Sequence, residues 1–239
     1  MKAESVVTAN ILYASSNRTC GNMSLSYGPT QGALDNRKNF LSRLGIDYQD
    51  LVCAKQIHSA NVKLVKQQDK GKGAMSYEGA IADTDALITD QKNLPLAIFT
   101  ADCLAISLYD PMHPACGIVH AGWRSAKEGI LKKALEAMQK EFGSSPERML
   151  LRLGPAIRSC CYEVGKEFTG FFPEALEQRD SRFYLDLIAA NTKQALSLGV
   201  DARNISDCLV CTSCRNKEFF SFRREKEQAG RTMSVVMLK

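Results

Sequence analysis

The chain has 239 residues, of which 45% are hydrophobic and 24% are charged, so it can bury the core of one globular domain. Its net charge of +5 is spread along the sequence, and the interleaved aromatic residues of a single-strand nucleic-acid binder are missing. No apolar run approaches the roughly 18 residues of a membrane span. We therefore predict one domain over residues 1–239 with no nucleic-acid or membrane partner, and the positive charge suits a small anionic substrate such as phosphate.

The cysteines indicate a reducing compartment. The chain has nine, an odd number, and Cys53, Cys103 and Cys116 lie in apolar segments where a reduced thiol packs well. The N-terminal apolar patch is interrupted by Thr8 and Asn10, unlike a signal peptide. These features predict a cytoplasmic protein.

The first part of the chain is predicted to form short strands, one surface helix and polar loops. Apolar residues at helical spacing predict a helix over 35–44, ended by Gly45, and the glycine-containing segment 67–77 is predicted to be a loop. Apolar runs predict strands at 6–13, 51–57, 62–65 and, after a polar turn, within 82–89. We expect 51–57 and 62–65 to pair around His58.

The central stretch carries the residues on which the interpretation depends. Residues 98–125 read I-F-T-A-D-C-L-A-I-S-L-Y-D-P-M-H-P-A-C-G-I-V-H-A-G-W-R-S, and strands are predicted at 96–99, 104–109 and 115–119. The last two should pair because the loop between them is short and contains two prolines. Cys103 and His120, 17 residues apart, can therefore be close in space.

His58 is a candidate third member of this group, because two of the chain's three histidines lie at strand ends. Three protein ligands and one open position are typical of a catalytic zinc site. His58, Cys103 and His120 are thus candidate zinc ligands, although each taken alone also fits a hydrogen-bonded histidine or a core cysteine. Asp83 and Asp85 fit a general acid and base, an orienting group for the histidines, or turn residues.

A helix is predicted directly after this stretch. Residues 125–128 form a capping box, and apolar residues repeat at helical spacing as far as Phe142. The N-terminus of such a helix, with Arg124 just before it, is suited to phosphate, although Arg124 can equally pair with an acid. Trp123 can stack on a purine or pack in the core.

The C-terminal part is predicted to contain further strands at 149–153, 183–187, 205–210, 219–224 and 231–238, and a helix ending at Leu198. Cys161 fits a substrate contact or packing, since a nucleophilic thiolate would need an electropositive partner. Cys208, Cys211 and Cys214 form two C-x-x-C steps that resemble part of a metal motif but lack a fourth thiolate. Arg223 and Arg224 are candidates for an anion contact or a dimer surface.

Four segments together resemble a widespread family. They read Q-I-H at 56–58, T-A-D-C at 100–103, H-A-G-W-R at 120–124, and L-G-P-A-I at 153–157 followed by C-Y-E-V-G at 161–165. The family was first labelled laccase-domain or multicopper polyphenol oxidase and is now described as purine nucleoside phosphorylase with adenosine deaminase activity. The resemblance extends from residue 11 to residue 238. A multicopper oxidase needs about ten histidines, and this chain has three.

The resemblance implies an α+β fold of two packed mixed β-sheets with flanking helices, in α/β/β/α layers. It implies that His58, Cys103 and His120 bind Zn²⁺ and that purine nucleoside and phosphate are the substrates. Phosphate would attack the anomeric carbon of the ribose, or water activated by zinc would attack C6 of adenine. Asp102 is the candidate proton-transfer residue. Arg18 is a candidate active-site contact, since the family carries an arginine before a Gly-rich turn in this region.

Two other functions remain open on the sequence. Family members have also been described as peptidoglycan editing factors, which would make the chain an amidase that removes a wrong amino acid from a cell-wall precursor. A metal-stabilised binding protein without turnover is the alternative outside the enzymes. The preferred nucleoside and the oligomeric state, a homodimer included, are not determined by the sequence.

Overall fold

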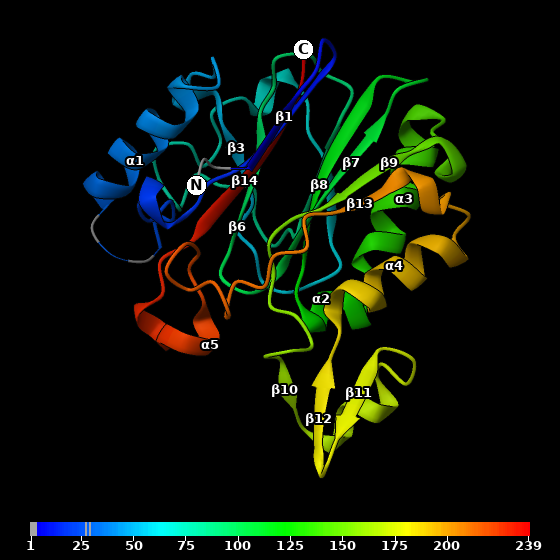
Figure 1. The fold of residues 1–239 in the computed structure, drawn as a ribbon. Coiled ribbons are helices and arrows are strands. Elements are labelled where there is room, and N and C mark those ends of the chain that lie inside the picture. Colours follow the sequence, from blue (N-terminus) through cyan, green and yellow to red (C-terminus); the bar gives the residue numbers. More distant parts are fainter. Residues whose placement is uncertain (1–3, 27, 29) are drawn as a thin grey trace.

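The computed structural model describes residues 4–26, 28 and 30–239, and within them the chain forms three β-sheets and five α-helices (Figure 1). The helices are α1 Thr30–Ser42, α2 Trp123–Lys127, α3 Ile130–Phe142, α4 Leu187–Ser197 and α5 Phe222–Glu225. The two larger sheets pack face to face and the smallest lies at one end of the molecule.

The first large sheet has the strand order β1-β2-β14-β6-β3. Its strands are β1 Glu4–Val7, β2 Ile11–Ser15, β14 Thr232–Leu238, β6 Leu96–Thr100 and β3 Val52–Cys53. All neighbours are antiparallel except β3 and β6. This five-stranded sheet is therefore mixed, and it joins both ends of the described chain to its middle.

The second large sheet has the order β13-β9-β7-β8-β5-β4. Its strands are β13 Ile205–Asp207, β9 Leu150–Leu153, β7 Leu104–Asp110, β8 Ala115–Ala121, β5 Ala86–Thr89 and β4 Val62–Leu64. Its outermost pairs are parallel and its inner pairs antiparallel, so it is mixed as well. The third sheet is antiparallel and consists of β10 Glu163–Val164, β12 Arg182–Leu185 and β11 Leu176–Arg179.

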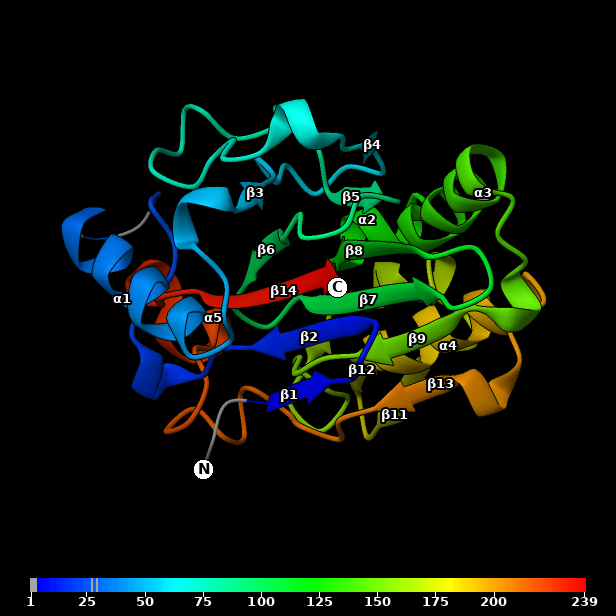
Figure 2. The same cartoon turned by 90° about the horizontal axis from the view of Figure 1, so that it is seen from above.

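Alternation along the strands explains the layers. In β14, Val236 and Leu238 point into the core shared by the two large sheets, whereas Val235 and Met237 pack in the cluster that includes Phe40 of α1. On the far side, α3 and α4 cover the six-stranded sheet, and Figure 2 shows α1 and α3 at opposite sides of the two sheets. The expected α+β class and α/β/β/α layers are confirmed, with the third sheet as an addition.

Several predicted elements were wrong in their extent or pairing. Segments 51–57 and 62–65 do not pair, because β3 belongs to the five-stranded sheet and β4 to the six-stranded one. Segment 219–224 does not form a strand and instead contains the start of α5. The helix predicted from 125 to 142 is two helices, since Gly129 adopts a φ of 76° between α2 and α3.

Candidate metal centre

Two sheet-to-sheet crossings of the chain bring the candidate ligands together. His58 lies in the connection from β3 to β4, and Cys103 lies in the connection from β6 to β7, each of which passes from the five-stranded to the six-stranded sheet. His120 lies near the end of β8. The side chain of Gln56 fixes the first crossing to β6, since it accepts from the Phe99 N–H (2.7 Å) and donates to its carbonyl (2.8 Å).

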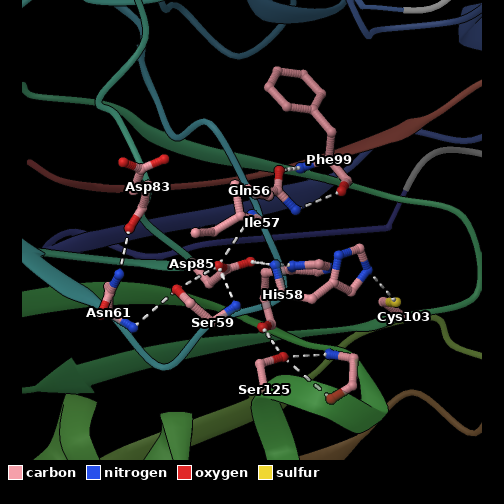
Figure 3. A network of polar contacts seen from close by, with 12 residues as sticks. Gln56, Ile57, His58, Ser59, Asn61, Asp83, Asp85, Phe99, Cys103 and Ser125 are labelled. Carbon is pink, nitrogen blue, oxygen red and sulfur yellow. Dashed lines mark hydrogen bonds and ion pairs between the residues drawn. The ribbon is translucent and has the colours of Figure 1, made fainter.

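The three side chains converge as the sequence predicted. One nitrogen of each histidine and the sulfur of Cys103 all lie within 4.8 Å of one another. The Cys103 Sγ is 3.9 Å from His58 Nε2 (Figure 3). Ordinary zinc–sulfur and zinc–nitrogen bonds at a tetrahedral angle would place such a pair about 3.6 Å apart. The donor set and its spacing therefore fit one metal ion.

Asp85 orients both histidines from behind. Its fully buried carboxylate lies 2.7 Å from His120 Nδ1, which leaves Nε2 of that ring for a metal. It also accepts hydrogen bonds from the backbone N–H groups of Ile57, His58 and Ser59, at 3.2, 3.0 and 2.8 Å (Figure 3). One carboxylate thus holds the ring of His120 and the turn that carries His58.

Asp83 has a different place from Asp85. It has a φ of 47° in the turn before β5, and its backbone carbonyl accepts from the Asn61 side chain at 2.8 Å. Of the alternatives that the sequence left open, the turn role fits Asp83 and the orienting role fits Asp85.

The polar contacts perturb the ionisation of the site. Burial opposes ionisation of Cys103, yet the neighbouring His120 and His58 lower the pKa of its thiol to about 6. Burial likewise opposes charge on His120, but Cys103 and Asp85 raise its pKa to about 9. Cys103 is therefore readily available as the thiolate that a metal ion requires.

The backbone around the site is strained and closely packed. His58 has a φ of 61° and Asp102 a φ of 83°, both in the left-handed region that costs a non-glycine residue energy. A Cβ added to Gly122 would lie 3.0 Å from the Cys103 sulfur and 3.0 Å from the His58 ring. A side chain in place of the glycine of the H-A-G-W-R segment would therefore crowd both Cys103 and His58.

Asp102, the candidate proton carrier, anchors the C-terminal segment. Its carboxylate accepts from Thr212 Oγ1 at 2.6 Å, from Ser221 Oγ at 3.0 Å and from the Arg223 N–H at 2.6 Å. Its own backbone carbonyl accepts from Ile157 at 2.9 Å. A carboxylate occupied by three donors holds residues in position, and this arrangement favours a supporting role over proton transfer.

A cavity of about 790 Å³ opens beside the three ligands, which form part of its wall. Its volume lies in the range of pockets that take small molecules. Aromatic side chains line it at Phe99, Trp123, Tyr162, Phe168 and Phe222. Exposed basic side chains of Arg124 and Lys226 and the partly buried Arg223 lie on the same wall. Phe168 and Lys226 belong to no motif in the sequence, because they join the cavity only through tertiary folding.

Two other candidate residues lie outside the cavity lining. Arg18 forms an ion pair with Glu225 and donates to the Phe219 carbonyl at 3.0 Å. Cys161 lies 3.4 Å, sulfur to sulfur, from Cys214. Neither is among the described residues that line the cavity, and substrate contacts from Arg18 and Cys161 stay a prediction.

Arg124 does line the cavity, but the helix that follows it differs from the expectation. Helix α2 begins at Trp123 and has five residues, and Ser125 Oγ accepts from the N–H of its capping residue Gly122 at 3.0 Å. Such a short helix provides little dipole for an anion. The Arg124 guanidinium lies 4.5 Å from the Trp123 ring, and among the described residues it has no carboxylate partner. The arginine side chain itself remains the candidate anion contact.

Comparison with known proteins shows to which family the chain belongs. Residues 14–239 match the family described as multi-copper polyphenol oxidoreductase laccase. The chain belongs to this family. Within the part of the chain that the structure describes, no helix is long and apolar enough to cross a membrane.

Curated relatives in the family carry enzyme names. The chain is 31% identical to purine nucleoside phosphorylase YlmD of Geobacillus stearothermophilus, over 90% of this chain and 82% of that protein. It is 32% identical to adenosine deaminase RL5 of an unknown prokaryotic organism, over 86% of this chain and 82% of that protein. The crystal structure of the Bacillus licheniformis protein YfiH has a TM-score of 0.91 and 30% identity, covering 96% of this chain and 93% of that one. The chain is thus a member of an enzyme family.

Proposed function

We propose that this protein is a zinc-dependent purine nucleoside phosphorylase that also deaminates adenosine. The observation that carries the proposal is the convergence of His58, Cys103 and His120 within 4.8 Å at the wall of a cavity of about 790 Å³. The relatives named purine nucleoside phosphorylase and adenosine deaminase, at 31 and 32% identity, support the substrate class.

Zinc is the metal that the donor set favours. One thiolate and two imidazoles are common zinc ligands, and a three-residue set leaves a coordination position for catalysis. The chain has three histidines in all, too few for the several copper ions named in the family description. When bound, zinc would supply a Lewis acid that polarises an oxygen next to the reacting carbon.

The cavity suits a purine nucleoside. Aromatic rings at Trp123, Tyr162 and Phe168 offer flat apolar surfaces on which a purine can stack. Trp123 is itself held by Phe168, with ring centroids 5.0 Å apart, so its orientation is fixed before a ligand enters. Arg124 supplies a guanidinium beside these rings, and such groups bind phosphate through two parallel hydrogen bonds.

The remaining polar residues act by positioning. Asp85 fixes the tautomer of His120 and the turn of His58. Asp102 lies next to Cys103 in the connection between β6 and β7. Its carboxylate binds that connection to Ser221 and to the backbone of Arg223. The guanidinium carbon of Arg223 lies 5.4 Å from the centre of the Tyr162 ring. Asp102 therefore connects the segment of Cys103 to the aromatic wall on which a purine would stack.

The test is incubation of the zinc-loaded protein with inosine and with adenosine, each with and without phosphate. Free hypoxanthine that forms from inosine only with phosphate is expected, because phosphate is the nucleophile in phosphorolysis. Ammonia released from adenosine without phosphate is expected for the deaminase reaction. His120→Ala should abolish both.

Other outcomes identify the rival functions. Release of an amino acid from a muramyl peptide, with no change in either nucleoside, would point to the editing amidase. Nucleoside binding by calorimetry without any product would point to a binding protein. Turnover that survives removal of bound zinc would contradict the metal dependence.

A further inference from the structure

A second cluster of metal-binding side chains lies away from the cavity lining. The sulfur atoms of Cys160, Cys161, Cys211 and Cys214 all lie within 4.8 Å of one another. Cys214 Sγ is 3.5 Å from Cys160 Sγ and 3.4 Å from Cys161 Sγ. None of these side chains contributes to the proposed catalytic site, so the cluster needs its own explanation.

The sheet topology creates this cluster from two distant segments. Strands β9 and β13 are parallel neighbours, and the segments that follow them leave the sheet together. Ala156 and Cys211 continue the pairing as an isolated parallel bridge, in which Ala156 accepts from the Thr212 N–H at 3.0 Å. Cysteines at the two turns that follow are therefore brought face to face.

The spacing fits a single ion. Zinc–sulfur bonds of about 2.3 Å at tetrahedral angles place the sulfurs about 3.8 Å apart. The observed separations of 3.4 and 3.5 Å and the upper limit of 4.8 Å lie around that value. Four thiolates in tetrahedral array are a preferred zinc environment, and the four-ligand set leaves no position for substrate.

The cluster is accessible to a metal ion. Cys160 and Cys214 are exposed, and all four cysteines are free thiols in the structure.

We propose that Cys160, Cys161, Cys211 and Cys214 bind one zinc ion in a closed, structural site. The ion ties the loop after β9 to the loop after β13. The first loop continues directly into Tyr162 and the second leads to Arg223, both of which line the cavity. Arg223 donates to the Glu163 carbonyl at 2.9 Å, so the two segments stay together as one wall of the cavity.

The four clustered cysteines are not the ones that the C-x-x-C spacing in the sequence groups together. Cys208 belongs to the same tandem C-x-x-C pattern, but it is not among the four clustered sulfurs. Cys160 and Cys161 take its place from a segment about fifty residues earlier. Cys208 is therefore a matched control for the proposal, because it is adjacent in sequence and partly buried but should not bind the metal.

The experiment is the zinc content of the full-length protein, expressed with zinc and purified without a chelator or a metal-affinity tag. Two equivalents per chain are expected for the wild type and for Cys208→Ser. Cys160→Ser/Cys214→Ser should retain one equivalent, and His120→Ala should retain one. Because each variant empties a different site, the four-cysteine site and the proposed catalytic site can fail separately.

X-ray absorption at the zinc edge of the wild type makes the test independent of how the variants fold. If both sites are filled, sulfur should outnumber nitrogen around the average zinc, whereas the proposed catalytic site alone gives more nitrogen than sulfur. A wild-type content of one equivalent that the double variant keeps unchanged, or two equivalents in the double variant, would overturn the proposal. A Cys161–Cys214 disulfide, found by mass spectrometry after alkylation of the freshly purified protein, would overturn it as well.

Discussion

The two clusters of metal-binding side chains differ in every respect that decides what a metal can do. His58, Cys103 and His120 form three ligands at the wall of a cavity. The four cysteines form a complete ligand set on two segments of the chain, and none of them lines that cavity. An incomplete set beside a cavity leaves room for substrate, and a complete set on loops cross-links the chain. Ligand count and surroundings thus separate a candidate catalytic site from a candidate structural one.

Charge sharpens the same contrast. Zinc with one thiolate and two neutral imidazoles keeps a net positive charge and can polarise an oxygen. Zinc with four thiolates carries a net negative charge and is a poor Lewis acid. The first site also has a buried carboxylate behind one of its histidines, since Asp85 lies 2.7 Å from His120 Nδ1. The strained φ angles of His58 and Asp102 also occur there.

The largest expected effect compares one cysteine from each cluster. Cys103→Ala should reduce nucleoside phosphorolysis to the level of the no-enzyme control, because two imidazoles alone hold zinc weakly and incorrectly. Cys214→Ala should leave kcat at room temperature close to the wild-type value, since Cys214 belongs neither to the three-ligand cluster nor to the cavity lining. Initial rates with inosine and phosphate measure both. Equal losses in the two variants would erase the distinction between the clusters.

Thermal stability should depend more on the four-cysteine cluster than on the three-ligand site, the opposite of what is expected for catalytic activity. An ion bound at 1,000 times its Kd adds about 4.1 kcal/mol, which raises Tm by about 8 °C or more in a chain of this size. The closed four-cysteine site ties two loops together, and so its loss should account for most of the fall in Tm on chelation. We expect Cys160→Ser/Cys214→Ser to have a low Tm that chelator hardly changes. His120→Ala should keep most of the chelator-sensitive part.

The sequence predicted the three-ligand site better than the four-cysteine cluster. Cys103 and His120 flank a predicted hairpin, and that hairpin forms, with Ala105 opposite His120 in the register of β7 and β8. His58 was found through the shortage of histidines and the family resemblance. The expected pairing of 51–57 with 62–65 was wrong, because local apolar runs do not reveal to which of two sheets a strand belongs.

The four-cysteine cluster lay beyond the reach of spacing arguments. A short motif predicts only ligands that are near one another in sequence. The tandem pattern of Cys208, Cys211 and Cys214 contains three thiols and lacks a fourth. The missing pair, Cys160 and Cys161, is brought to this pattern by the parallel pairing of β9 with β13.

The prediction of a strand at 219–224 was wrong for a related reason. Ser221 and the Arg223 N–H of this segment donate to the carboxylate of Asp102, and the chain turns into α5, so tertiary contacts override its strand pattern.

Asp85→Asn tests whether the buried carboxylate is what distinguishes the first site. Loss of such an orienting partner lowers metal affinity or activity by about 10–100-fold. We expect a loss in that range, together with a weaker affinity for zinc in competition with a chromogenic chelator. Excess zinc should restore part of the activity, which a purely structural defect would not allow. Asp83→Asn, in the same turn but with a backbone role, should match the wild type in both measurements.

The smallest expected effect separates the two substrates within the first site. One hydrogen bond to a charged group contributes about 1.5 kcal/mol at the low end, so Arg124→Ala should raise the KM for phosphate by roughly tenfold. The KM for inosine should stay near the wild-type value, because the aromatic rings that would stack on the purine remain. Arg148→Ala, another exposed arginine, is the matched control, since it lies outside the cavity lining. A rise in the KM for inosine alone would instead place the Arg124 guanidinium against the nucleoside, on the face of Trp123 that it already covers.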